Sequence, residues 1–146
     1  MLYSFKNSKW LAVFGLLIAT FLFINTAIAE VSVVVHPDNT SSFDNNDIKK
    51  LFLGKNKSFS NGRIAILIGP NQSDPTRAVF NDKVLNKSSN QVNAYWSKMM
   101  FTGKGVPPQE MSSASEIISA IADNKDAISY IDSSAVTSAV KVVATF

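Results

Sequence analysis

The chain has 146 residues, no cysteine, one histidine and a formal net charge of +3. Without cysteine, no disulfide can stabilise the fold, so a hydrophobic core alone has to hold it. Two of the lysines lie in the amino-terminal segment, and without them twelve basic residues face eleven acidic ones. A net charge near +1 with no basic stripe gives no reason to expect a nucleic-acid partner.

The amino terminus has the pattern of a secretory signal peptide. Lys6 and Lys9 precede an apolar run over residues 11–24, and Ala27-Ile28-Ala29 before Glu30 is an A-x-A cleavage sequence. A charged start, an apolar centre and small residues at the end are the three parts of a cleavable leader. We therefore expect cleavage after Ala29.

This interpretation divides the chain into a signal peptide over residues 1–29 and one domain over residues 30–146. The alternative is an uncleaved membrane anchor, for which the apolar run is slightly short and Asn25 is badly placed. The lack of cysteine also excludes a lipid-modified cysteine at the cleavage site. We expect a periplasmic protein that is free of the membrane.

Periodicity and turn residues predict alternating strands and helices in the remaining chain. Strands are expected over residues 31–36, 64–68, 127–131 and 140–146. Helices are expected from Asp44 to Gly54, after Asp74, after Ser88 or Ser89, and after Ser112 or Ser113, with one short helical turn within residues 133–138. Large aromatic residues at helical spacing, Trp96 and Phe101, are expected in the core. This alternation predicts an α/β domain with a mostly parallel sheet of about four or five strands flanked by helices.

The stretch over residues 63–80 organises the rest of the chain. Its apolar run, residues 64–68, predicts a strand buried on both faces, with Leu67 fully buried. Asp74 then has the residue type of a helix N-cap, and Pro75 suits the first helical position.

A helix that starts at the carboxyl end of such a strand is where open α/β sheets bind anions. Ser73 and Thr76 add hydroxyls there, and Arg77 adds donors suited to an oxyanion. Asp74 argues against an anion, since its carboxylate would occupy the free N–H groups. A well-capped helix without a ligand therefore remains an equal alternative.

Catalytic chemistry has little support in this sequence. His36 is the only histidine, it stands before a proline, and no G-x-S-x-G motif accompanies it. The chain has no recognisable metal-ligand spacing, and Gly103-Lys104-Gly105 lacks the spacing of a phosphate-binding P-loop. We expect no enzyme, no metal and no cofactor.

Four stretches resemble one family in the same order along the chain. DIKKLFLGKNKSF and QSDPTRAVF are similar to the Leu-x-x-Ile-Phe-x-Gly-Lys and Gly-Ser-Gly-Thr-Arg segments of phosphate ABC transporter substrate-binding proteins. DAISYID resembles the Gly-Ala-Ile-Gly-Tyr-Val segment of that family, and AYWSKMMFTGKGVPP resembles its short, single-domain members. The resemblance implies one lobe of a type II periplasmic-binding fold.

The resemblance also implies which residues would contact an anion. Thr76 and Arg77 match the family's Thr and Arg, whereas Asp74 stands where the family has a phosphate-binding serine. Independently of the family, Thr40 and Ser41 lie in the first loop after a strand, a position that tends to face a binding cleft. The anion-binding candidates are thus Ser73, Thr76, Arg77, Thr40 and Ser41.

Two hypotheses about function follow from these patterns. The first is a periplasmic solute-binding module for phosphate or a similar oxyanion, which binds weakly because a single lobe leaves its ligand partly in water. The second is a protein-interaction or sensory module of the cell envelope that has lost ligand binding. The expected partners are a small oxyanion and, beyond it, an envelope membrane protein or a second copy of the chain.

Overall fold

In the computed structural model, the structure describes residues 29–146, so the signal peptide expected over residues 1–29 lies outside the described part except for its last residue. Five strands and four α-helices follow one another in the described chain, with a π-helical turn (Asn81–Leu85) and a 3-10 turn (Ser133–Ala135) between them. In chain order, they are β1 (Val31–Val35), α1 (Asn45–Phe52), β2 (Ile66–Pro70), α2 (Pro75–Phe80), α3 (Ser89–Phe101), β3 (Gln109–Met111), α4 (Ala114–Asp123), β4 (Ala127–Asp132) and β5 (Lys141–Thr145).

The strands form one five-stranded sheet in the order β3-β2-β4-β1-β5. β2 is parallel to both β3 and β4, whereas β1 is antiparallel to β4 and to β5. Four strands therefore share one direction and β1 alone runs against them. The predicted α/β class, with a mostly parallel sheet flanked by helices, is confirmed, and β1 adds two antiparallel pairings.

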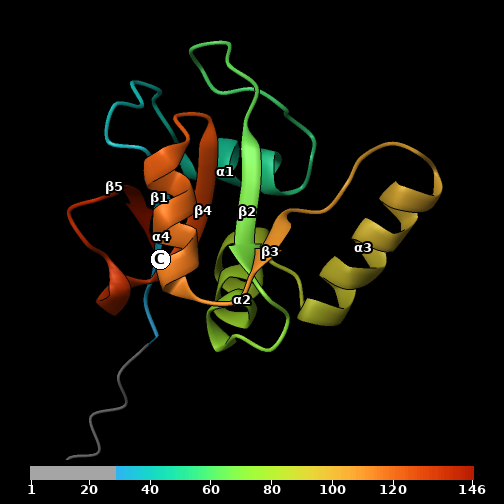
Figure 1. Ribbon diagram of the computed structural model, residues 1–146. Helices are drawn as coiled ribbons and strands as arrows, with labels where there is room; N and C mark the ends of the chain where they lie inside the picture. Colours follow the sequence, from blue (N-terminus) through green and yellow to red (C-terminus); the bar gives the residue numbers. More distant parts are fainter. Residues whose placement is uncertain (1–28) are drawn as a thin grey trace, which may run out of the picture.

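Helices cover both faces of the sheet (Figure 1). The side chains of β1 alternate between two hydrophobic clusters: Val33 packs in the cluster formed with α1, α2 and α3, and Val34 packs in the cluster formed with α4. Because strand residues point alternately to opposite faces, a strand covered on both sides buries every side chain. All five residues of β1 and the first five of β4 are buried accordingly.

The predicted helix boundaries are confirmed by their caps. Asp44 and Ser88 each form a capping box with the residue three positions later, Asp47 and Gln91. Each box satisfies N–H groups that have no partner within the helix, and so defines where the helix begins. The π-helical turn after α2 ends at Asn86, which has a positive φ of 54°.

Three expectations about burial are wrong. β2 begins at Ile66, and Ile64 and Ile66 are 71% and 42% exposed, so the start of the apolar run is not buried on both faces. Leu67 is partly buried and not fully buried. Phe101, expected in the core, is 93% exposed at the end of α3, whereas Trp96 is buried as expected.

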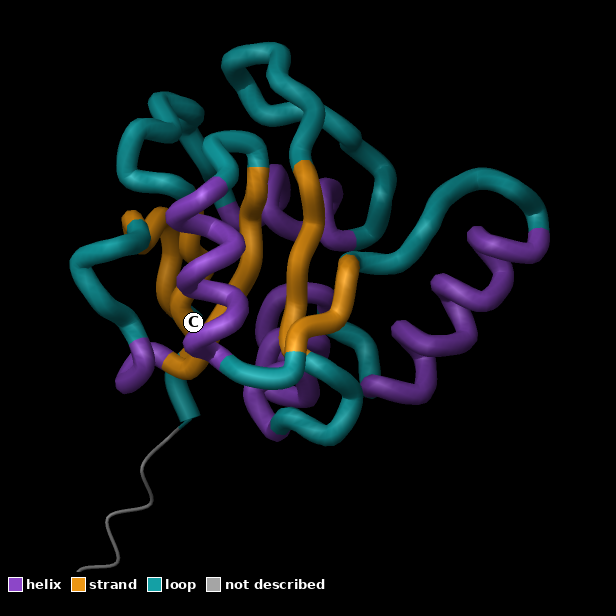
Figure 2. The backbone as a smooth tube through the Cα atoms, viewed as in Figure 1, coloured by secondary structure: helices purple, strands orange, loops and turns teal. Residues whose placement is uncertain are grey.

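Helix α3 stands to one side of the sheet, next to the edge strand β3, and a loop over residues 102–108 joins the two (Figures 1 and 2). Val92 and Trp96 anchor the helix to the core. Among residues 29–146, no helix has the length and apolar character needed to cross a membrane.

Candidate functional site

The start of α2 lies at the carboxyl end of β2, as the sequence predicts, and it is already capped. The Asp74 carboxylate accepts a hydrogen bond of 2.9 Å from the Thr76 N–H, and the Asp74 carbonyl accepts one of 3.1 Å from the Arg77 N–H. The N–H groups that a bound anion would use are therefore partly occupied by the chain itself. This is the self-capped arrangement that the sequence left open as an alternative.

Two oxygen atoms accept hydrogen bonds from one guanidinium nitrogen of Arg77. Its Nη1 donates to Glu110 Oε1 at 2.6 Å and to the Pro70 carbonyl at 3.2 Å. The Arg77 side chain is only 13% exposed, whereas the Glu110 side chain is 42% exposed. A guanidinium group carries five N–H donors, and within residues 29–146 neither Nε nor Nη2 of Arg77 has a hydrogen-bond partner. Donors suited to an oxyanion therefore remain free at this position.

Tyr130 of β4 forms the floor of the site. Its ring stacks on Phe80 with centroids 3.7 Å apart, and an edge contact with Phe52 holds the pair in place. Burial raises the pKa of the Tyr130 phenol; the charge of Arg77 lowers it, and those of Asp74 and Glu110 raise it. The phenol thus stays protonated at neutral pH and remains a hydrogen-bond donor within the field of these three charges.

Gly69 of β2 gives the Tyr130 hydroxyl its space, since a Cβ atom at Gly69 would lie 3.3 Å from that oxygen. The crevice beside it has a volume of about 20 Å³, with Arg77, Glu110 and Tyr130 among its lining residues. This space suits water and is too small for a tetrahedral oxyanion while Glu110 stays in place.

The structure brings together three of the five predicted anion-binding residues. Thr76 and Arg77 lie in the first turn of α2, and Ser73 lies just before its N-cap, at the carboxyl end of β2. The Ser73 hydroxyl donates to Asn71 Oδ1 at 2.6 Å, and Thr76 is 8% exposed. Anion binding by these residues stays a prediction.

Thr40 and Ser41 lie at the opposite end of the strands, near the amino ends of β2 and β4. Because β1 is antiparallel to β4, the loop after β1 reaches the amino ends of β2 and β4. A strand of five residues, at about 3.3 Å per residue, separates the two ends by roughly 15 Å. The structure therefore does not place Thr40 and Ser41 in the same site as Arg77.

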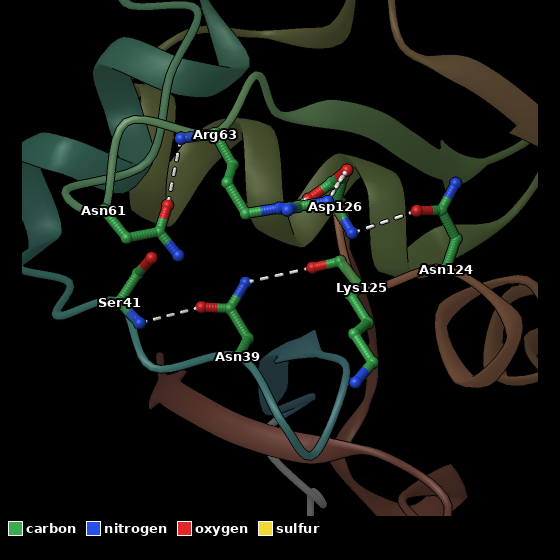
Figure 3. A network of polar contacts seen from close by, with 7 residues as sticks. All are labelled: Asn39, Ser41, Asn61, Arg63, Asn124, Lys125 and Asp126. Carbon is green, nitrogen blue, oxygen red and sulfur yellow. Dashed lines mark hydrogen bonds and ion pairs between the residues drawn. The ribbon is translucent and has the colours of Figure 1, made fainter.

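A separate polar network includes Ser41 (Figure 3). Asn39 Nδ2 donates to the Lys125 carbonyl at 3.3 Å, and the Ser41 N–H donates to Asn39 Oδ1 at 2.9 Å. Nearby, Arg63 forms an ion pair with Asp126. The Asn39 contact joins the loop after β1 to the turn before β4, and the Arg63 ion pair joins the segment before β2 to the same turn.

Sequence reasoning missed two residues of the site, Glu110 and Tyr130. Glu110 lies in β3, a strand of three residues with no apolar alternation, so no pattern marks it. Tyr130 lies in the DAISYID segment, where the family resemblance was visible but gave no role to the phenol.

Comparison with known proteins gives a fold and no sequence relative. No protein-family model matches the chain, and no curated protein matches it. The similar solved structures include an ABC-type phosphate transport receptor from Vibrio cholerae (TM-score 0.61, 15% identity), a putative phosphate ABC transporter substrate-binding protein with bound phosphate from Clostridium perfringens (0.62, 20%) and a possible phosphate binding protein from Planctomyces limnophilus (0.57, 18%).

These similarities cover 79–80% of this chain but only 42–46% of the solved chains. The chain therefore spans less than half the length of the structures it matches. Its fold is that of one part of a periplasmic-binding-protein-like structure, which confirms the predicted fold class. At identities of 15–20%, the likeness is one of fold alone.

Proposed function

We propose that this chain is an extracytoplasmic solute-binding module that takes phosphate or a similar small oxyanion at the start of α2, and that it is not an enzyme. The observation that carries the proposal is Arg77, a mostly buried arginine with two guanidinium nitrogens free, beside a helix start at the carboxyl end of a strand. Support comes also from the similar structure of Clostridium perfringens, which has phosphate bound.

The carboxylates at the site restrict which anion can bind. Glu110 and Asp74 would repel a fully ionised oxyanion. An oxyanion that keeps a proton can instead donate a hydrogen bond to a carboxylate oxygen. Phosphate keeps at least one proton at neutral pH and sulfate keeps none. Since the Glu110 side chain is 42% exposed, it can move toward solvent and leave Arg77 to the ligand.

Calorimetric titration with phosphate and sulfate at low salt tests this proposal. Arg77→Ala should weaken phosphate binding by roughly 1.5–3 kcal/mol, or one to two decades in affinity, because it removes charge-assisted hydrogen bonds. Glu110→Gln and Asp74→Ser should strengthen binding, and Glu110→Gln should also admit sulfate. Urea unfolding of each variant provides the folding control. If neither wild type nor the two carboxylate variants bind phosphate, the solute-binding proposal fails.

The second candidate, a protein-interaction or sensory module, is favoured by the closed state of the same site. Asp74 caps its own helix and Glu110 holds Arg77, so a lobe that has lost its ligand would look the same. The absence of anion binding in all three proteins, with folding unchanged, is the result that this candidate predicts.

Export is part of the proposal and has its own measurement. The intact mass of the protein recovered from the periplasm of an expressing bacterium should correspond to a chain that starts at Glu30. A membrane-bound product of full length would contradict cleavage after Ala29.

A further inference from the structure

The amino half of β2 borders an open groove that the proposed anion site does not use. β3 pairs only with Ile68, Gly69 and Pro70, so no strand covers that side of Ile66 and Leu67. There the structure has a cavity of about 480 Å³. Its walls are the segment over residues 54–57, the start of β2, α3 and the loop over residues 103–107. Figure 2 shows this loop running from the end of α3 back to β3.

Apolar side chains and glycines shape the groove around Trp96. A Cβ atom at Gly54 would lie 3.0 Å from Trp96 Cη2, and one at Gly105 would lie 3.5 Å from Trp96 Cζ3. At Gly54 any other residue would press on the indole ring, whereas a Cβ atom at Gly105 would meet the ring at ordinary van der Waals distance. On the opposite wall, Ile64 and Ile66 expose apolar surface that a folded protein ordinarily buries.

The charge at the groove has one sign. Lys57 and Lys104 are among the lining residues, and no aspartate or glutamate is. Within residues 29–146, neither lysine ammonium forms an ion pair or a side-chain hydrogen bond. Each is exposed. A ligand in the groove thus meets an apolar surface and two unpaired positive charges.

We propose that this groove binds a small amphipathic anion, namely a carboxylate with an aliphatic or aromatic body. The body would pack on the exposed side chains of Ile66 and Val106 while the carboxylate pairs with Lys57 and Lys104, so each part of the ligand meets its chemical complement. A cavity of about 480 Å³ is within the range of small-molecule sites in proteins. Inorganic phosphate has no apolar surface that this groove could bury. The proposal therefore does not rest on the anion site at α2.

Octanoate and 4-phenylbutyrate are the probes, with octanamide as the neutral match of octanoate. Titration of the purified protein should give saturable binding of both carboxylates by calorimetry and should move the indole N–H signal of Trp96 in a ¹H–¹⁵N spectrum. Octanamide should bind roughly threefold to tenfold more weakly, because it cannot pair with the lysines. Because Trp96 also lines the crevice beside Arg77, phosphate serves as the competitor, and it should not displace octanoate from the groove.

Four variants locate the binding. Lys57→Gln and Lys104→Gln should each weaken octanoate binding roughly twofold to fivefold without changing octanamide binding. Ile64→Asn should weaken both ligands, and it leaves the fold intact because Ile64 is 71% exposed. Phe101→Ser is the matched control, since Phe101 is an exposed apolar residue of α3 that does not line the groove.

Three results would overturn the proposal. The first is no saturable binding of either carboxylate. The second is binding that the lysine and Ile64 variants leave unchanged. The third is that the protein binds vesicles of anionic phospholipid but neither carboxylate, and that Phe101→Ser abolishes the vesicle binding. This would indicate a membrane-contacting surface at the end of α3 instead of a small-molecule groove.

Discussion

The carboxyl end and the amino half of β2 differ in whether the charged side chains beside them have partners within the protein. At the carboxyl end, Asp74 caps α2 and Glu110 holds Arg77, so each charge has an internal partner. Just before the amino half, Ile64 is exposed beside a groove whose lysines have no partner in the described chain. A ligand at α2 has to replace a carboxylate, whereas a ligand in the groove meets no internal competitor. The position that open α/β sheets use for anions is thus the more restricted of the two.

The largest difference is expected between two isoleucine-to-alanine variants, one at a buried position and one at an exposed position. Ile128→Ala in β4 should lower the free energy of unfolding by roughly 2–5 kcal/mol, because Ile128 is fully buried between β1 and β2 and its loss leaves a cavity. Ile64→Ala, the same change at the groove, should alter it by less than about 0.5 kcal/mol. Urea unfolding measures both.

Equal losses in the two variants would show that the start of β2 is as well covered as β4. A preserved far-ultraviolet circular dichroism spectrum at zero denaturant is the control, since both values refer to a folded starting state.

The sequence predicts best what short stretches decide. Asp74 and Pro75, or Ser88 and Gln91, define a helix start from within four residues, and the structure confirms both starts. The apolar run before Asp74 is a different case. Five apolar residues have the same pattern whether both faces are covered or one edge is open, so the exposure of Ile64 could not be predicted.

Contacts between distant segments account for what the sequence left out. The partner of Arg77, Glu110, is 33 positions away in a strand too short to recognise. The direction of β1 depends on its pairing with β4 and β5, which only the assembled sheet decides. That direction separates Thr40 and Ser41 from Arg77, so the predicted residues that are close in sequence lie together and the two distant ones lie apart.

The closed end of β2 can be examined separately through the alkaline dependence of stability. Burial raises the pKa of Tyr130 above its ordinary value of 10.0. Above that pH the unfolded chain loses the phenol proton while the folded protein keeps it, so stability falls as the pH rises. Tyr130→Phe should remove this loss, and the difference between the two proteins should change by up to about 1.4 kcal/mol per pH unit above pH 10.

Guanidinium unfolding at a series of alkaline pH values measures this difference. The lysines titrate alike in both proteins and cancel in the comparison. Parallel stability curves for wild type and Tyr130→Phe would mean that folding does not raise the pKa of the Tyr130 phenol.

The smallest effect is expected at the exposed ion pair near the amino end of β2, where Arg63 lowers the pKa of the Asp126 carboxyl below its ordinary value of 3.8. A carboxyl whose pKa is depressed in the folded state contributes stability that is present above its unfolded pKa and is lost as the pH falls through the folded value. Asp126→Asn and Arg63→Gln should therefore both flatten the acid side of the stability curve, below about pH 4, to the same small extent. Added salt should reduce the difference, because the pair is open to solvent. Urea unfolding at acid pH measures it. If Asp126→Asn keeps the full acid dependence of the wild type, the carboxylate does not interact with Arg63 in solution, and the amino end of β2 has no internal charge pairing comparable with that of Arg77 and Glu110.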